Sequence, residues 1–183
     1  MMKLKPLRQY SEADVINGFF ALNSNTGDEG QLVSISSGWV NGTDNHRDIA
    51  LTSQANVVSN RRVLKSEVKL ATSGQDKGDV LGMLLVNVRS VDYLGRDLMY
   101  DDVRKVEANA VVSGEAVKFV KRGMFLVSGY EGVAGQGSGI AVSNSAAGVW
   151  RSYNPDVETT VKTLGQFLGS ADTEGYALAW LDC

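Results

Sequence analysis

The chain contains a single histidine. Any nucleophilic or metal-assisted reaction that requires an imidazole would therefore have to involve this residue. A Ser–His or Cys–His pair, or a site with several histidine ligands, would have to include His46. This residue lies in the polar run Asp44–Asp48, which lacks the ligand spacing of a metal site. We therefore interpret His46 as a solvent-exposed loop residue.

Two further segments have residue types suited to chemistry but the wrong context. Asp101 and Asp102 are adjacent, and adjacent side chains of a strand point to opposite faces, so we expect a turn rather than a carboxylate pair. The glycine-rich run Gly135–Gly139 is not followed by a helix or by a Lys-Ser/Thr pair, which a phosphate-binding loop requires. We predict a hairpin loop there.

The remaining candidates do not add a reactive site. Cys183 is the only cysteine, which excludes an intrachain disulfide and a thiolate zinc site, and we expect a free, inert thiol. Lys121 and Arg122 stand beside a turn, where they are either solvated or in contact with an acidic partner surface. We therefore predict no catalytic residue, no metal ligand and no cofactor, and the protein is not expected to be an enzyme.

Composition narrows the class of partner. The 183 residues suffice for one domain with a real core, and 43% hydrophobic and 21% charged residues are ordinary for a globular protein. A net charge of -3 and a pI near 5.2 argue against a nucleic-acid surface. Neither a signal peptide nor an apolar run of membrane-spanning length is present in the sequence, so we expect no membrane partner and synthesis in a reducing cytoplasm.

The pattern of the second half of the chain indicates strands. Short apolar-alternating runs, such as Val80–Val91, Val106–Val112 and Met124–Val127, are separated about every ten residues by Gly, Asn or Asp. Many short runs with turn residues at this spacing are typical of a β-barrel or β-sandwich. We predict an all-β protein.

We divide the chain into an N-terminal arm, a polar loop or insertion region and a β-barrel domain, at residues 1–23, 24–62 and 63–183. In the arm, Ser11 is a suitable cap for a helix of about two turns that Gly18 would end. The apolar patch Phe19–Leu22 then either packs on its own domain or docks on a neighbouring subunit. In the second part, Gln31–Ser36 is strand-like, and Ile49–Val58 is either a strand or a one-sided loop.

Four stretches together resemble a known family. They are Tyr10–Asn17 with Phe20–Leu22, Leu81–Leu85 running to Arg89, Val111–Val117 leading to Arg122–Phe125, and Gly165–Leu168 with Asp172–Asp182. In this order, and over nearly the whole chain, they are similar to the head decoration, or cement, proteins of tailed bacteriophages. The resemblance rests on order and coverage, since none of the motifs is catalytic.

The resemblance implies a small β-barrel of the β-tulip type on the outer surface of a virion, made in the host cytoplasm. Such proteins stand as homotrimers at or near three-fold positions and brace the lattice of the major capsid protein, with an N-terminal arm in contact. The partners expected are thus the major capsid protein and other copies of the chain. Because aromatic and large apolar groups dominate interface energies, the candidate contact residues are Leu7, Tyr10, Phe19, Phe20 and Leu22.

A carbohydrate- or receptor-binding β module on the virion surface is the alternative, with Trp39, Trp150, Tyr153 and Trp180 as stacking residues. Trp180 lies in the alternating run Gly175–Leu181, which is apolar on both faces, so we expect it in the core. Trp150 and Tyr153 flank a turn, and the sequence does not decide whether they lie in the core or at the surface. We also expect that removal of residues 1–22 leaves the β domain folded.

Overall fold

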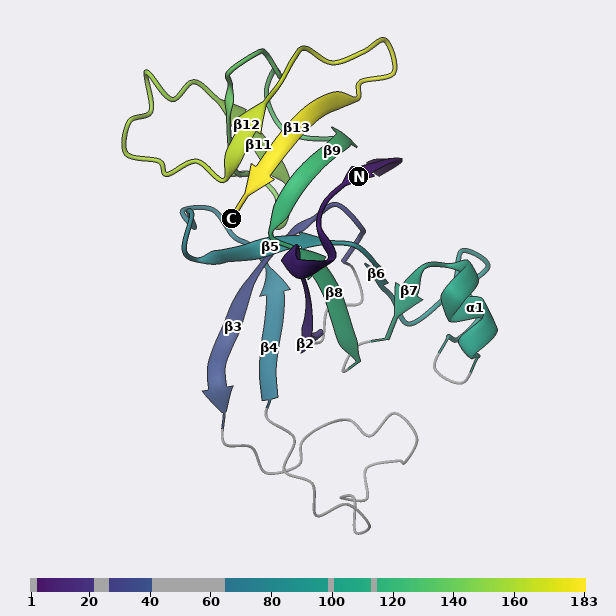
Figure 1. Ribbon diagram of the computed structural model, residues 1–183. Coiled ribbons are helices and arrows are strands. Elements are labelled where there is room, and N and C mark those ends of the chain that lie inside the picture. The colour runs from purple at the N-terminus through teal and green to yellow at the C-terminus, as the bar shows by residue number, and fades with distance from the viewer. Residues whose placement is uncertain (1–2, 22–26, 41–64, 99–100, 113–114) are drawn as a thin grey trace.

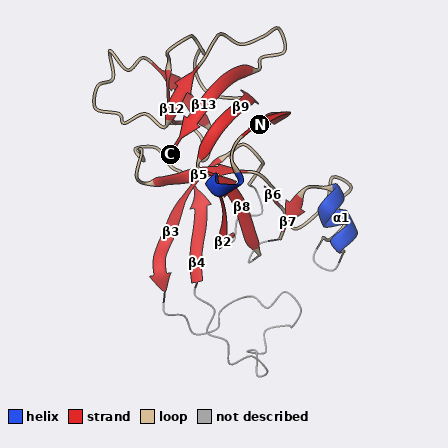
Figure 2. Ribbon diagram, viewed as in Figure 1, coloured by secondary structure: helices blue, strands red, loops and turns tan. Residues whose placement is uncertain are grey.

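The computed structural model describes residues 3–21, 27–40, 65–98, 101–112 and 115–183, and within them its regular secondary structure is almost wholly strand (Figures 1 and 2). The all-β prediction is confirmed. The elements are β1 (Lys3–Gln9), η1 (Glu12–Asp14), β2 (Val15–Ala21), β3 (Leu32–Val40), β4 (Lys65–Leu70), β5 (Val80–Leu84), β6 (Asn87–Val88), α1 (Asp102–Glu107), β7 (Ala110–Val111), β8 (Ala116–Val120), β9 (Arg122–Ser128), β10 (Gly139–Val142), β11 (Trp150–Tyr153), β12 (Gly165–Phe167) and β13 (Ala177–Asp182).

The strands form two main sheets. Six of them make an antiparallel sheet in the order β1-β9-β13-β12-β10-β11, and β2, β4, β3, β5 and β8 pair into a closed barrel. All pairs of the barrel are antiparallel except β2 with β4. Gly165, at φ 153°, allows β12 to approach β13, because a Cβ there would lie 2.0 Å from the carbonyl oxygen of Trp180.

The main core lies between the sheet and the barrel. It joins buried side chains of the barrel strands, among them Leu32 and Met83, to sheet residues such as Phe125 and Leu181. A second cluster, which includes Val33 and Phe119, belongs to the barrel strands and β6. The sheet and the barrel therefore share one apolar core, and we call the two together the body.

The N-terminal segment differs from the predicted arm. The helix expected after Ser11 is a single 3-10 turn, and the residues after it form β2. Strand β1 pairs with β9 and β2 pairs with β8 and β4, so residues 3–21 belong to the two sheets. Their strand partners lie far along the chain, which is why local patterning did not reveal them. The strand expected at Gln31–Ser36 is confirmed as part of β3.

A short helix replaces the turn expected at Asp101–Asp102. The Asp101 carboxylate accepts a hydrogen bond from the Arg104 backbone N–H at 3.0 Å and caps α1, and the helix ends before β7. The run Val106–Val112, predicted as a strand, therefore begins in this helix. As expected, Asp101 and Asp102 do not act as a pair, since each contacts a different cation of the helix.

The last strand faces the opposite way to the prediction. In β13 the small residues Ala177 and Ala179 point with Leu181 into the core, while Trp180 is 36% exposed. Trp150, on β11, is fully buried and donates its indole N–H to the Gly30 carbonyl oxygen at 2.7 Å. The expectation that Trp180 is a core residue is thus wrong, because Phe125 and Phe167, the neighbours of Ala179 on the two adjacent strands, fill the core on the buried face.

Candidate contact surfaces

Helix α1 presents its apolar residues to solvent. Val103 and Val106, three positions apart and so on one helix face, are 69% and 81% exposed. Asp102 and Glu107 are exposed beside them. An apolar helix face normally packs against a core, so this arrangement is the reverse of the usual one.

The opposite face of α1 holds the helix in place through charged groups. Lys105 donates to the Glu115 carboxylate at 2.8 Å and lies 3.3 Å from Asp102. Burial, the largest single influence, would lower the pKa of Lys105, but the hydrogen bonds and charges of Glu115 and Asp102 together outweigh it and raise the pKa. Arg104 pairs with Asp101 at 3.0 Å. The polar face of the helix is therefore turned inward and neutralised.

A hairpin before α1 carries two more exposed apolar side chains. The Asp92 carboxylate accepts hydrogen bonds from the backbone N–H groups of Leu94 and Arg96 at 2.8 and 2.9 Å, and from the Arg96 side chain at 2.7 Å. Gly95, at φ 77°, completes the turn. With its polar groups bonded internally, the tip presents Leu94 and Tyr93, the latter 84% exposed.

We call residues 89–98 and 101–112 the α1 lobe. It has its own small buried cluster of Leu98, Ala110 and Val112. Its strand β7 pairs in parallel with β6, and the lobe lies to one side of the barrel, away from β13 (Figure 1). The lobe is thus a projection with an apolar outward surface.

A second apolar surface lies on the outer face of the six-stranded sheet. On β9 and β13, inward residues alternate with Met124, Leu126, Leu178 and Trp180, which are half-buried or exposed. Met124 lies opposite Trp180 and Leu126 lies opposite Leu178 in the strand register. These four side chains therefore form one cross-strand apolar patch, which we call the β9/β13 face.

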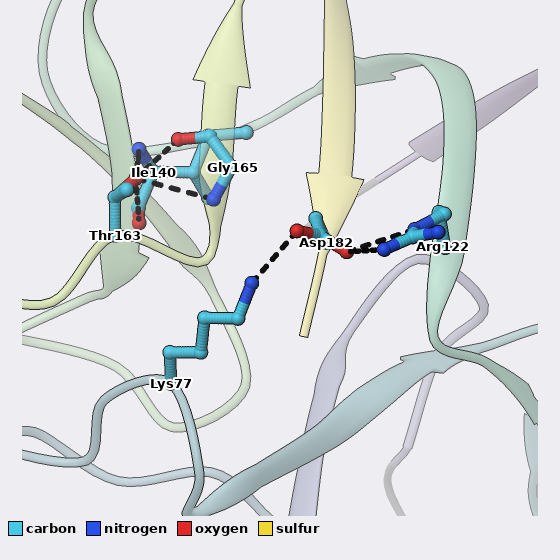
Figure 3. Close-up of polar contacts among 6 residues, drawn as sticks. All are labelled: Lys77, Arg122, Ile140, Thr163, Gly165 and Asp182. Carbon is cyan, nitrogen blue, oxygen red and sulfur yellow. Dashed lines mark hydrogen bonds and ion pairs between the residues drawn. The ribbon is translucent and has the colours of Figure 1, made fainter.

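Ion pairs border this patch at both ends. At one end, Asp182 accepts from Lys77 at 2.7 Å and from two nitrogens of Arg122, each at 2.8 Å (Figure 3). These hydrogen bonds, the one from Lys77 foremost, lower the pKa of Asp182. At the other end, Lys5 lies 2.5 Å from Glu174 and 4.2 Å above the Tyr176 ring. An apolar centre with a polar rim is the usual anatomy of a protein interface.

The same close-up shows how the neighbouring strand is fixed. The Thr163 hydroxyl accepts from the backbone N–H groups of Ile140 and Gly165 at 3.3 and 3.1 Å, where β12 joins β10 (Figure 3). The Asp182 backbone N–H in turn donates to the Leu164 carbonyl oxygen at 2.7 Å. These hydrogen bonds therefore fix the strands of the sheet whose outer surface is the β9/β13 face.

Other polar clusters are internally satisfied. An open groove is lined in part by Asp28, Asn87 and Arg89, but Arg89 pairs with Asp28, and Asn87 accepts from the Glu29 backbone N–H at 3.0 Å. The Glu131 carboxylate accepts from the Ser143 hydroxyl, which is the main reason why its pKa is lowered. Such bonding is suited to holding loops in place.

The structure separates the sequence-predicted contact residues. Tyr10 packs on the main core, with its ring 6.0 Å from that of Phe125, so it is largely committed to its own chain. Leu7 lies in β1, and Phe19 and Phe20 lie in β2, opposite Val117 and Ala116 of β8. Leu22 lies outside the described residues.

The aromatic residues of the sugar-binding alternative are also separated. Trp150 and Tyr153 are buried, and the Tyr153 hydroxyl contacts the Val161 carbonyl oxygen at 3.2 Å. Trp39 lies in β3. Of the four, Trp180 is the residue that the structure places at the surface with an exposed ring, so the predicted set does not form one stacking platform.

The structure describes some of the residues that the sequence offered for catalysis or metal binding. His46 lies outside the described residues. Gly135–Gly139 is a turn that leads into β10, so the expected loop is confirmed, but it is not a hairpin loop because β9 and β10 do not pair. Cys183 is a free thiol whose burial raises its pKa to about 12, which disfavours the reactive thiolate. Among the described residues, no group of three His, Cys, Asp or Glu side chains is arranged to hold a metal ion.

Sequence reasoning missed both apolar surfaces. The signal for the α1 lobe was Asp101 as a cap before Val103 and Val106 at helical spacing.

Within the part of the chain that the structure describes, no helix has the length and apolar character needed to cross a membrane. Comparisons with protein-family models, curated proteins and solved structures find no match to the chain.

Proposed function

We propose that this protein is a virion structural protein that binds the outer surface of a tailed-bacteriophage capsid and stabilises the lattice of the major capsid protein. The observation that carries the proposal is the outward apolar face of α1, with Val103 and Val106 in solvent and the charged face turned in. A lobe built in this way gains free energy by contact with another surface. The sequence resemblance to decoration proteins, with their β-tulip barrel and homotrimeric state, supports the choice of partner.

The mechanism is binding alone. A protein that binds the assembled shell and not its separate parts stabilises the shell by mass action. One contact can be weak, because several copies joined together and touching several capsomers raise the effective concentration of each further contact. No covalent step is needed.

The test uses expanded shells assembled from the major capsid protein of a candidate phage, prepared without the decoration protein. We expect saturable co-sedimentation of the purified protein with the shells and a higher melting temperature of the decorated shells. Unexpanded shells of the same protein are the control for a lattice-specific site. A protein that neither co-sediments with expanded shells nor changes their melting temperature would refute the proposal, and binding to a glycan array instead would favour the carbohydrate-binding alternative.

A further inference from the structure

An open groove lies where the six-stranded sheet, the barrel and the α1 lobe meet. Its lining residues come from all three parts: Lys3 and Leu4 from β1, Tyr176 from the residue before β13, Asp28 and Glu29 from the segment before β3, and Asn87 and Arg89 from β6 and the start of the lobe. The volume of the groove is about 310 Å³, which is the size of a site for a small molecule. Ligand sites occur preferentially at junctions between structural units.

The lining of the groove is polar and carries both signs of charge. Lys3 and Arg89 are cations, and Asp28 and Glu29 are anions. An apolar ligand is disfavoured, because it would remove water from these charges without replacing the hydrogen bonds. A ligand with a net charge would be attracted by two of these groups and repelled by the other two. The groove is therefore suited to a polar, uncharged ligand.

Hydrogen bonds within the chain hold the groove residues in position. The Arg89 guanidinium pairs with the Asp28 carboxylate, and the Glu29 backbone N–H donates to the side-chain oxygen of Asn87 at 3.0 Å. The Asp28 backbone N–H donates to the side-chain oxygen of Gln31 at 2.7 Å. Because these bonds are present without a ligand, little conformational entropy is lost when a ligand binds.

The bonds within the chain do not use every polar atom of the groove. Arg89 contacts Asp28 through one nitrogen, so its other nitrogens can donate to a ligand and the second carboxylate oxygen of Asp28 can accept. Among the described residues, neither the Lys3 ammonium group nor the Tyr176 hydroxyl has a hydrogen-bond partner. The Tyr176 ring is held by Lys5, which lies 4.2 Å from its centre and contacts two carboxylates. The groove thus offers donors and acceptors side by side.

We infer that the groove binds one sugar unit of a neutral glycan. A sugar hydroxyl both donates and accepts, so neighbouring hydroxyls of one ring can bond to Arg89 and to Asp28 at once. A peptide separates its donors and acceptors between N–H and C=O groups, and it fits less well to a guanidinium and a carboxylate that are themselves in contact. Hydrogen bonds to ionised groups are stronger than those between neutral groups, which favours an uncharged ligand with many hydroxyls.

This inference goes beyond the capsid role, because it gives the protein a second kind of ligand. It also assigns carbohydrate binding to residues other than the tryptophans. Trp150 is buried, and the exposed ring of Trp180 lies among apolar side chains on the β9/β13 face. The groove, in contrast, combines charged groups with the Tyr176 hydroxyl.

The test measures binding of the methyl glycosides of glucose, galactose, mannose and N-acetylglucosamine to the purified protein by saturation-transfer NMR. Glycerol is the control for weak binding of any polyol. We expect at least one glycoside to bind with a dissociation constant on the order of millimolar, as is usual for a ligand of about a dozen heavy atoms. The anionic methyl glycoside of N-acetylneuraminic acid and the cationic sugar glucosamine should both bind more weakly than the best neutral glycoside.

Matched variants locate the binding in the groove. Lys3→Gln/Tyr176→Phe removes one ammonium group and one hydroxyl from the lining, and should weaken binding roughly tenfold through the loss of two hydrogen bonds. Lys162→Gln/Tyr93→Phe makes the same changes at exposed positions outside the groove, and should leave binding unchanged. Circular dichroism checks that both proteins fold. If the groove variant does not fold, Lys3→Gln alone takes its place, with an expected loss of roughly threefold.

Three results would overturn the inference: no glycoside that binds above the level of glycerol, a charged sugar that binds most tightly, or a groove variant that binds as well as the wild type. Co-sedimentation with expanded shells, measured on the same samples, reports separately on the proposed function. Shell binding without sugar binding would refute the groove site alone, and sugar binding without shell binding would refute the capsid role alone.

Discussion

The body and the α1 lobe place their apolar side chains in opposite directions. In the body, Phe125 and Leu181 are fully buried between the sheet and the barrel. In the lobe, Val103 and Val106 face solvent, and the helix is held by the Asp101 cap and the Lys105–Glu115 ion pair. Where caps and ion pairs fix an element, its apolar residues are not needed for folding and are left for contact. The predictions below test this division, from the largest expected effect to the smallest.

Deletion of residues 1–22 should destroy cooperative folding, which replaces the expectation from the sequence that the β domain folds without them. The deletion removes β1 from the sheet and β2 from the barrel, which exposes the edge of β9 and opens the barrel between β8 and β4. Circular dichroism and urea unfolding measure the effect. Deletion of Met1 and Met2 alone, which precede β1, is the control. A truncated protein that unfolds at the wild-type urea midpoint would show that the body does not depend on these strands.

The two tryptophans should differ strongly. Trp150→Ala removes a fully buried ring and its hydrogen bond to Gly30, and should lower the free energy of unfolding by about 3–5 kcal/mol. Trp180→Ala removes a ring on the outer face and should cost about 1 kcal/mol or less in the monomer. Urea unfolding of both variants under conditions that keep the protein monomeric decides the matter. Equal losses would mean that the β9/β13 face is part of the core.

The cap of α1 should matter to the lobe and not to the body. Asp101→Ala leaves the Arg104 N–H without its acceptor, and should destabilise the helix by about 1 kcal/mol. Hydrogen exchange of the α1 amides should speed up, while exchange in β9 and β13 stays unchanged. The control is Asp102→Ala, whose carboxylate is exposed and lies outside the cap. Faster exchange throughout the chain would contradict the separation of lobe and body.

The sequence predicts the fold class because strand patterns are local. The alternating run of β9 and the turn glycines, such as Gly129, are readable without knowledge of the partners. The place of the N-terminal segment is not readable in this way, since β1 pairs with a strand more than a hundred residues later. Pairing at such a distance depends on the whole core.

The candidate surfaces were harder to predict for two different reasons. Helix α1 has only six residues, too few for a periodic signal to stand out from the alternation around it. In β13 both faces are apolar, so the sequence pattern does not show which face is buried. The choice is made by packing: Phe167 of β12 lies beside Ala179 on the buried face and leaves room there for a methyl group and not for an indole, so Trp180 is turned outward.

The ion pairs of Asp182 at the end of the β9/β13 face should make the smallest contribution to the free energy of unfolding. This contribution can be recognised by its dependence on pH. Hydrogen bonds from Lys77 and then Arg122 lower the pKa of Asp182 in the folded protein below its ordinary value of 3.8. A lowered pKa means that the stabilisation is present above pH 3.8 and is lost as the pH falls through the folded-state pKa. Asp182→Asn should thus lower the free energy of unfolding by about 1 kcal/mol or less at pH 7, and by progressively less below pH 3.8. Urea unfolding of the wild type and the variant at pH 7 and below pH 3.8 measures the difference in the free energy of unfolding between the two proteins. Asp156→Asn, in the exposed loop after β11, is the control. A deficit that stays constant down to pH 2 would show that the Asp182 charge does not stabilise the junction of the sheet with the Lys77 loop.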